Sequence, residues 1–239
     1  MNKQAIRFMG KEVEQKEVRF LTCGIDITPQ ERDDKKIEEI MNDVGIENKH
    51  DVLIKYEELL MHVARIAWND DVMTYLEYRL LSEDKPVFNL NGRLKRTYGR
   101  FYRRFVDRKT FDVYKKIELS KIVFEHGTLI EIVDVVLHEI CHAVVYFSKF
   151  NHVDHAPAFE YMLRLVGASS TCTGSVDIPH HRYICIGCDC VYYSNNKYRK
   201  RYVCREHHNK LVHVGYMTDK EFKAYDVQTF KDEYKKRNK

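Results

Sequence analysis

Residues 128–147 read TLIEIVDVVLHEICHAVVYF, the most apolar stretch of the chain, and they decide its fold. An α-helix advances about 100° per residue, so His138 and His142 lie one turn apart on one face, where both imidazoles can bind one metal ion. Glu139 then lies beside that ion, free to act on its bound water. Burying an unpaired carboxylate is costly, and a zinc ion with its water relieves that cost. The stretch therefore predicts a buried helix with the chemistry of zinc hydrolysis.

The residues before the motif indicate where this helix begins. Thr128 and Glu131 have the spacing of a capping box, and Asp134 lies near the positive N-terminal end of the helix dipole. The HExxH pattern alone is only moderately specific in a chain with 12 histidines, because such a chain produces it by chance more often. A third ligand after the helix would make the assignment stronger.

The segment after the helix offers two candidates for that third ligand. A catalytic zinc needs three protein ligands and one open position for water. His152 and His155 both lie in the loop 149–157. We favour His155, because it comes just before Pro157, a residue suited to the first turn of the next helix, where packing can hold an imidazole against the metal. His152 lies deeper in the loop and is the alternative.

A second metal site is indicated further along the chain. Cys185 and Cys188 form one pair of candidate ligands, and Cys204 and His207 form a second pair after fifteen intervening residues. This spacing is typical of two zinc knuckles, whose four ligands fill the tetrahedron and leave no place for a reactive water. The site is expected to stabilise a small segment with little core of its own. Cys190 and His208 remain alternatives to Cys188 and His207.

Composition limits the class of protein. The chain has 239 residues and seven cysteines, no apolar signal core at its N-terminus, and no run of 18 apolar residues. We expect an intracellular protein that is neither secreted nor membrane-bound. The net charge is +4, but residues 91–239 carry 27 Lys and Arg against 17 Asp and Glu. This excess suggests a polyanionic partner such as DNA, although a solvated basic surface is an equally ordinary explanation.

Two segments combine basic and aromatic residues. Ten basic residues and two acidic ones lie between Gly92 and Lys116, with tyrosines and phenylalanines interleaved, and the hairpin between the two knuckles is similar. Arginine with aromatic residues suits contact with nucleic acid, whereas strand aromatics often face a core. The candidate nucleic-acid contacts are Arg96, Arg100, Arg103, Lys197, Arg199, Lys200 and Arg201.

The remaining elements follow from hydrophobic spacing and from residues that start or stop helices. We expect a charged helix opened by Thr28 and Pro29 and ended by Gly45, and an amphipathic helix over 51–68. Two strands, 87–105 and 111–119, are expected before the metal helix. A second helix is expected over 158–166, ended by Gly167, and a last one from Thr218 to the basic C-terminus.

The order of these parts resembles a known family. FNLNGRLKRTYGRF (88–101), IELS (117–120), HEICHA (138–143) and HAPAF (155–159), followed by a zinc ribbon, are similar to the SprT-like (Spartan-related) zinc metalloproteases. The resemblance implies an α+β fold: a compact zincin-like metalloprotease domain with a small β-sheet, plus a C-terminal zinc ribbon. It also implies one zinc held by His138, His142 and His155, with Glu139 catalytic. Its implied role is an intracellular peptidase, with access to DNA, that degrades proteins crosslinked to DNA.

The resemblance covers about residues 50–215 and departs from the family in two places. Ala156 and Ala158 stand where the family usually has Gly and Glu, and His207 stands where the ribbon usually ends in a fourth cysteine, an exchange that preserves zinc binding. Four parts are expected: an N-terminal extension of open role (1–49), a SprT-like domain (50–170), a zinc ribbon (180–215) and a basic helical tail (216–239).

Two other functions stay open at this point. One is a zinc-containing DNA-binding protein in which the HExxH helix does not turn over substrate. The other is a peptidase that acts on free protein and has no role on single- or double-stranded DNA. The leading interpretation is a zinc endopeptidase with one catalytic and one structural zinc ion, acting on DNA-bound proteins.

Overall fold

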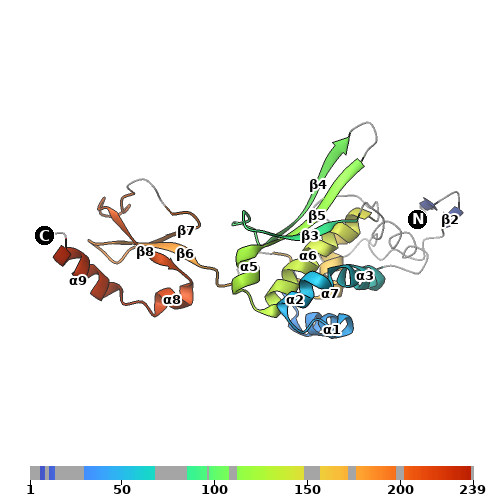
Figure 1. Ribbon diagram of the computed structural model, residues 1–239, viewed down its shortest axis with the longest axis horizontal. Helices are drawn as coiled ribbons and strands as arrows, with labels where there is room; N and C mark the ends of the chain where they lie inside the picture. Colours follow the sequence, from blue (N-terminus) through green and yellow to red (C-terminus); the bar gives the residue numbers. More distant parts are fainter. Residues whose placement is uncertain are drawn as a thin grey trace. The chain divides into compact units, whose positions relative to one another are not determined.

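The computed structural model describes residues 6–8, 11–13, 30–67, 85–95, 97–107, 112–147, 157–171, 176–197 and 202–237 (Figure 1). The chain divides into two compact units, 1–174 and 175–239. Helices and small sheets occur in both, so the predicted α+β class is confirmed. None of the helices in the described part of the chain is long and apolar enough to cross a bilayer.

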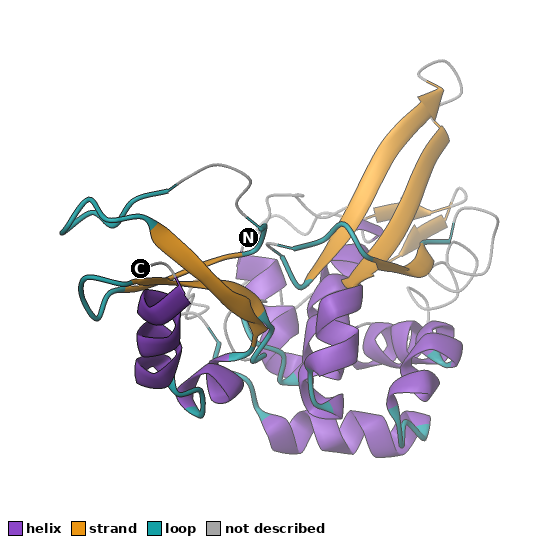
Figure 2. Ribbon diagram, turned by 60° about the vertical axis from the view of Figure 1, so that its left-hand side comes forward, coloured by secondary structure: helices purple, strands orange, loops and turns teal. Residues whose placement is uncertain are grey.

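Helix α6, Leu129–Phe147, is the centre of the first unit. It packs mainly on α1 (Asp34–Val44), α3 (Tyr56–Ala67) and α7 (Pro157–Val166), and it also contacts a three-stranded sheet. The sheet and the helices lie on different sides of α6 (Figure 2). A helix enclosed in this way must be apolar nearly all round, which explains the composition of residues 128–147.

The sheet consists of β3 (Val87–Asn91), β4 (Gly99–Asp107) and β5 (Asp112–Ser120), with β5 in the middle. Strand β3 runs parallel to β5, and β4 runs antiparallel to it. The prediction of one strand over 87–105 was wrong, because a turn after Asn91 divides it. The Asn91 side chain accepts a hydrogen bond from the Arg93 backbone (2.8 Å), which stabilises that turn.

Helix α1 begins later than predicted. Residues 28 and 29 lie outside the described residues, but residues 30–33 are not helical, and the side chain of Asp33 caps the helix by accepting from the Lys36 N–H (3.3 Å). An aspartate at this position satisfies one of the free N–H groups of the first turn. Gly45 ends the helix in the left-handed conformation (φ 74°), as predicted.

The helix expected over 51–68 is two helices. Helix α2, Lys49–Ile54, begins at a capping box formed by Asn48 and Asp51, and α3 begins at Tyr56 after a break at Lys55. The expected hydrophobic spacing is nevertheless correct, because the apolar face lies in the core: Val52, Tyr56, Leu59, Leu60 and Val63. A short helix, α5 (Lys121–His126), connects β5 to α6. Strands β1 (Ile6–Phe8) and β2 (Lys11–Val13) form a separate antiparallel pair.

The second unit is a three-stranded antiparallel sheet with two helices. Its strands are β6 (His180–Cys185), β7 (Val191–Ser194) and β8 (Leu211–Met217), with β6 in the middle. The capping box of Thr218 and Glu221 forms as predicted, but it starts only the short helix α8, Asp219–Lys223. The single C-terminal helix of the prediction is wrong, because a second helix, α9 (Val227–Arg237), follows a break.

Helix α9 is attached to the sheet unit by a buried lysine. The Nζ atom of Lys231 donates to the backbone carbonyl of Cys188 (2.7 Å) and contacts Asp189 Oδ1 (2.9 Å). Lys231 is only 5% exposed. Since a buried ammonium must be paired to be tolerated, the contact with the Cys188 carbonyl attaches the helix to the turn that carries Cys188.

Candidate metal centres

The HExxH helix begins where the sequence predicts. The Glu131 carboxylate accepts from the Thr128 N–H (2.8 Å), and the Glu131 N–H points back to Thr128 Oγ1 (3.4 Å), so the capping box is present. Along the rest of α6, His138 and Glu139 are as deeply buried as the apolar residues around them, at 4% exposed each. His142, one turn further on, is only partly buried, so one imidazole and the carboxylate are enclosed and the second imidazole is partly open to solvent.

The rings of His138 and His142 lie one helical turn apart, with centroids separated by 5.0 Å. Phe159 of α7 stacks on the His142 ring at 4.0 Å with an interplanar angle of 16°, and its ring meets His138 edge-on at 5.1 Å. One aromatic side chain therefore packs against both histidines. This packing limits the rotamers of both rings and favours a fixed orientation for metal binding.

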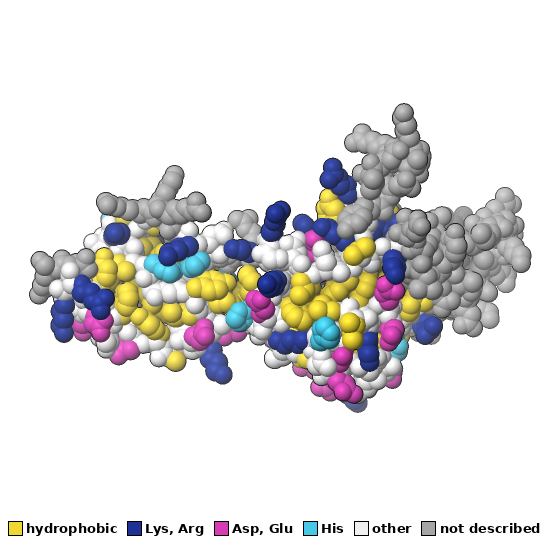
Figure 3. Space-filling view, in the orientation of Figure 1, with side chains coloured by type: hydrophobic (Ala, Val, Ile, Leu, Met, Phe, Trp, Pro, Cys, Tyr) yellow, Lys and Arg dark blue, Asp and Glu magenta, His cyan; other side chains and the backbone are white. Residues whose placement is uncertain are grey.

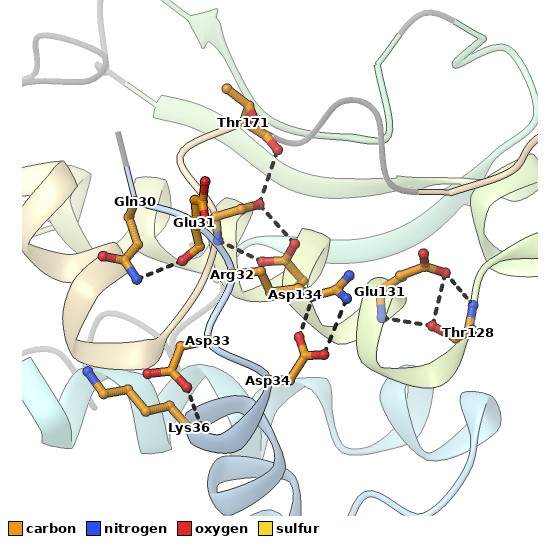
Figure 4. Close-up of polar contacts among 11 residues, drawn as sticks. Gln30, Glu31, Arg32, Asp33, Asp34, Lys36, Thr128, Glu131, Asp134 and Thr171 are labelled. Atoms are coloured by element: carbon orange, nitrogen blue, oxygen red, sulfur yellow. Dashed lines mark hydrogen bonds and ion pairs between the residues drawn. The ribbon is translucent and has the colours of Figure 1, made fainter. Parts of the chain in front are cut away.

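A hydrogen bond determines which nitrogen of His138 is available. Its Nδ1 atom lies 2.9 Å from the backbone carbonyl of Ser169, a contact in which the imidazole must donate. The Ser169 N–H and hydroxyl both donate to Asp134, each at 2.8 Å, and these contacts lie among the polar groups drawn in Figure 4. Nε2 of His138 is then left with its lone pair, which is the form that ligates a metal.

Asp134 has a larger role in the structure than its place near the start of the helix indicated. Burial raises the pKa of its carboxyl group, and the hydrogen bonds from Ser169 and the charge of Arg32 act in the opposite direction. The sequence contained a signal, because a carboxylate inside an apolar helix needs a partner and position 134 lies one turn before His138. The partner, Ser169, is 35 residues away and has no local signature.

The remaining residues of the predicted catalytic site divide into two groups. Both loop histidines, His152 and His155, lie outside the described residues, so the third ligand stays a prediction. Cys141, inside the motif, is fully buried, and burial raises the pKa of its thiol. A neutral thiol in the core is a packing residue rather than a nucleophile.

In the second unit, three predicted ligands come together. The sulfur atoms of Cys185, Cys188 and Cys204 all lie within 4.8 Å of one another, and those of Cys188 and Cys204 are 3.7 Å apart. Convergence of three thiols from two separate turns suggests a metal site, for which zinc is the usual occupant. The His207 imidazole is not part of this group in the structure.

The two turns that carry the thiols have matching hydrogen bonds. In the first, backbone hydrogen bonds from Gly187 and Cys188 reach the sulfur of Cys185. In the second, the Tyr192 hydroxyl, 3.3 Å from the Cys204 sulfur, and backbone hydrogen bonds from His207 and Glu206 lower the pKa of Cys204. In both turns, the backbone N–H groups two and three residues after the first cysteine thus donate to its sulfur.

This match bears on the choice between the two histidines of the second turn. His207 has the same place in its turn as Cys188 has in the first. His208 instead adopts the left-handed conformation (φ 53°), alone among the described non-glycine residues, as the chain leaves the turn. The backbone hydrogen bonds of the two turns therefore match at His207 and not at His208.

Three of the predicted nucleic-acid contacts, Arg100, Arg103 and Lys197, lie among the described residues. Arg96, Arg199, Lys200 and Arg201 lie outside the described residues. Arg100 pairs with Glu118 on one face of the sheet, whereas the Arg103 guanidinium lies over the Tyr146 ring of α6 (5.0 Å) on the other. Lys197, in the second unit, is exposed. On the face drawn in Figure 3, Lys and Arg side chains are scattered among hydrophobic and acidic ones.

In the first unit, α6 thus carries two histidines whose rings lie one turn apart, with the buried carboxylate of Glu139 beside them. Residues 68–180 match the sequence model of the SprT-like family, the family that the motifs predicted. That family is generally metalloprotease-like, which supports a zinc peptidase at the level of the family. No curated protein and no solved structure matches the chain significantly. The match includes α6 and α7 but begins after α1, α2 and α3.

Proposed function

We propose that the protein is an HExxH zinc endopeptidase. The observation that carries the proposal is the arrangement of His138 and His142, one turn apart on α6, with Glu139 buried next to them. Zinc at this site would polarise the scissile carbonyl and lower the pKa of a water molecule. Glu139 accepts the proton of the attacking water and passes it to the leaving amine, which needs one carboxylate close to both. His155 is the proposed third ligand.

The three converging thiols support a second, structural zinc ion. Cys185, Cys188 and Cys204 would hold it, with His207 as the fourth ligand, because the two turns have the same backbone pattern. Four protein ligands leave no open position, so this ion has no catalytic role. It would supply part of the folding free energy of the second unit.

We further propose that the substrates are proteins bound or crosslinked to DNA. The positive charge of residues 91–239 supports contact with a polyanion. Arg103 adds a local argument, since it is exposed and stacks on Tyr146, one turn beyond His142 on the same helix. A phosphate bound by Arg103 would lie close to the helix that carries the proposed catalytic residues.

The decisive experiment combines zinc quantification with cleavage assays of the wild type and of Glu139→Gln. We expect two zinc ions per chain in both proteins and cleavage only by the wild type. DNA, single- or double-stranded, should stimulate cleavage of a crosslinked protein, and the stimulation should fade as salt rises. Undiminished cleavage by Glu139→Gln would overturn the mechanism.

Two other outcomes identify the competing functions. A wild-type protein with one zinc ion, lost on Cys185→Ser and kept on His138→Ala, would be a DNA-binding protein without a catalytic centre. Cleavage of free protein that is indifferent to DNA at every salt concentration would identify a peptidase with no nucleic-acid role. Arg103→Ala with Arg104→Ala as its matched neighbour separates the proposed phosphate contact from the general loss of one charge.

A further inference from the structure

Residues 30–33, which precede α1, run beside residues 167–170, which follow α7. The Asp33 N–H donates to the Gly167 carbonyl (2.8 Å), and the Ser170 N–H donates to the Gln30 carbonyl (2.9 Å). The Gln30 N–H in turn donates to the Ser170 hydroxyl (2.5 Å). We call residues 30–33 the strap. It connects the start of α1 to the segment after α7, which lies more than a hundred residues later in the chain.

The strap fits closely at one glycine. Gly167 has φ 74°, and a β-carbon there would lie 2.9 Å from the Asp33 carbonyl oxygen and 2.7 Å from Lys36 Cβ. Both the backbone conformation and the space therefore require glycine at this position. The close approach holds the segment 167–170 at a fixed distance from α1.

Between the strap and the metal helix lies Ser169. All three of its polar groups are used toward α6: the N–H and the hydroxyl bind the two oxygens of Asp134, and the carbonyl accepts from His138 Nδ1. Asp134 and His138 are four residues apart, on the same face of α6. One serine thus joins a buried carboxylate to the proposed metal ligand.

The neighbouring polar groups are also buried and paired. Ser170 is buried, and its hydroxyl donates to Glu160 of α7 (2.5 Å) while it accepts from Gln30. Water does not readily replace hydrogen bonds at such sites, so the loss of one partner leaves another polar group unsatisfied. The hydrogen bond to the Ser169 carbonyl therefore orients the His138 ring together with the packing of Phe159.

We propose that Asp134 and Ser169 are positioning residues for His138, and that the strap holds Ser169 in place. This proposal rests on the proposed binding of a metal ion by His138. Part of the support for the metal site then comes from residues 30–33, which lie outside the segment 68–180 that matches the SprT-like family. Loss of such a partner typically weakens metal binding by roughly 10- to 100-fold.

Cobalt-substituted full-length protein tests the proposal, because thiolate-to-cobalt charge transfer marks only the cysteine site and the two metal sites are seen separately. We expect Asp134→Ala to release cobalt from the histidine site to a chelator roughly 10- to 100-fold faster, with the thiolate band unchanged. Ser169→Ala should show a smaller acceleration, and Ser169→Thr, which keeps the hydroxyl, should restore the slow release. Glu118→Gln removes another buried carboxylate, one that pairs with Arg100 on the face of the sheet turned away from α6, and should leave the release rate unchanged.

The strap itself is tested by a matched pair at position 30. Gln30→Pro removes the N–H that donates to Ser170 and should accelerate release, whereas Gln30→Ala keeps the backbone contacts and should not. Release at the wild-type rate from folded Asp134→Ala would overturn the proposal, as would equal acceleration by Glu118→Gln. A wild type that binds cobalt only through thiolates would instead refute the proposed function, so the two failures are distinguishable.

Discussion

Gly99 of β4 lies so close to Glu139 of α6 that a β-carbon at position 99 would stand 2.9 Å from Glu139 Cγ and 3.0 Å from Glu139 Oε1. It would also lie 2.8 Å from Val135 Cγ1. The backbone conformation of Gly99 does not demand glycine, so the requirement is one of space. The strand backbone passes directly against the proposed catalytic carboxylate, and the absence of a side chain allows it.

We therefore expect Gly99→Ala to displace Glu139. A shift of about 1 Å in a reacting group can cost roughly 100-fold in rate, so kcat should fall by about that factor while the zinc content stays at the wild-type value. Gly92→Ala is the matched control, because a β-carbon there meets nothing within 4 Å. Steady-state kinetics with metal analysis measures both, and an unchanged kcat in a folded Gly99→Ala protein would contradict the expectation.

A second prediction separates the two histidines of the second knuckle. His207→Ala should lose the structural zinc, measured by metal analysis, because a three-thiolate site lacks its fourth ligand. His208→Gly should retain zinc and raise stability by up to about 1 kcal/mol, because glycine adopts φ 53° without steric cost. Zinc loss in His208→Gly with retention in His207→Ala would reverse the assignment.

A third prediction concerns the attachment of α9. Lys231→Met removes the donor to the Cys188 carbonyl and should lower the free energy of unfolding of the second unit by about 1–3 kcal/mol. Asp189 is fully exposed (103%), so its ion pair with Lys231 contributes little and Asp189→Ala should be nearly neutral. Urea unfolding followed by tyrosine fluorescence compares the two. Equal losses would mean that the ion pair, not the carbonyl contact, holds the helix.

A fourth prediction follows from Glu118, which is 2% exposed in the sheet. Burial raises the pKa of its carboxyl group, but hydrogen bonds from Lys116 and Arg100 outweigh burial and hold the pKa below the usual value. The folded state therefore binds the proton less readily than the unfolded state. The resulting stability is complete above the unfolded-state pKa of about 4.3 and is lost as the pH falls through the lower folded-state pKa.

The measurement compares Glu118→Gln with the wild type. At pH 7 the variant should be less stable by roughly 1–2 kcal/mol, a modest value because Arg100 is 45% exposed and water screens the pair. The difference should shrink as the pH is lowered below about 4.3. A difference in the free energy of unfolding that is the same at all pH values would show that the carboxylate charge is not its source.

The elements predicted correctly from sequence are those with local causes. The capping box of Thr128 and Glu131 and the unbroken apolar pattern were sufficient for α6. Gly45 and Gly167 end helices in the left-handed conformation, as glycines at such positions commonly do. In these cases neighbouring residues supply both the signal and the interaction.

Some of the features that the sequence did not predict are decided by distant contacts. Asn91-Gly92 was a turn signal inside the expected strand 87–105, but only pairing with β5 shows that β3 and β4 are separate strands on its two sides. The prediction of the site met the same limit. Asp134 stands out in the sequence as a charged residue in an apolar helix, but no local pattern identifies Ser169 as its partner. The break between α8 and α9, by contrast, has a local cause, because the Asp226 carboxylate caps α9 by accepting from the N–H (2.9 Å) and the hydroxyl (2.6 Å) of Thr229.

The packing of α1 against α6 and α7 affects how the protein can be shortened. Ile37 and Ile40 of α1 are buried, and α3 buries Leu59, Leu60 and Val63 in the same core. A version that starts at residue 68, where the SprT-like match begins, would leave the apolar surface of α6 and α7 open to water. Exposed apolar surface of that kind promotes aggregation. An inactive fragment of that length would report a missing part of the hydrophobic core, and not the absence of an enzyme.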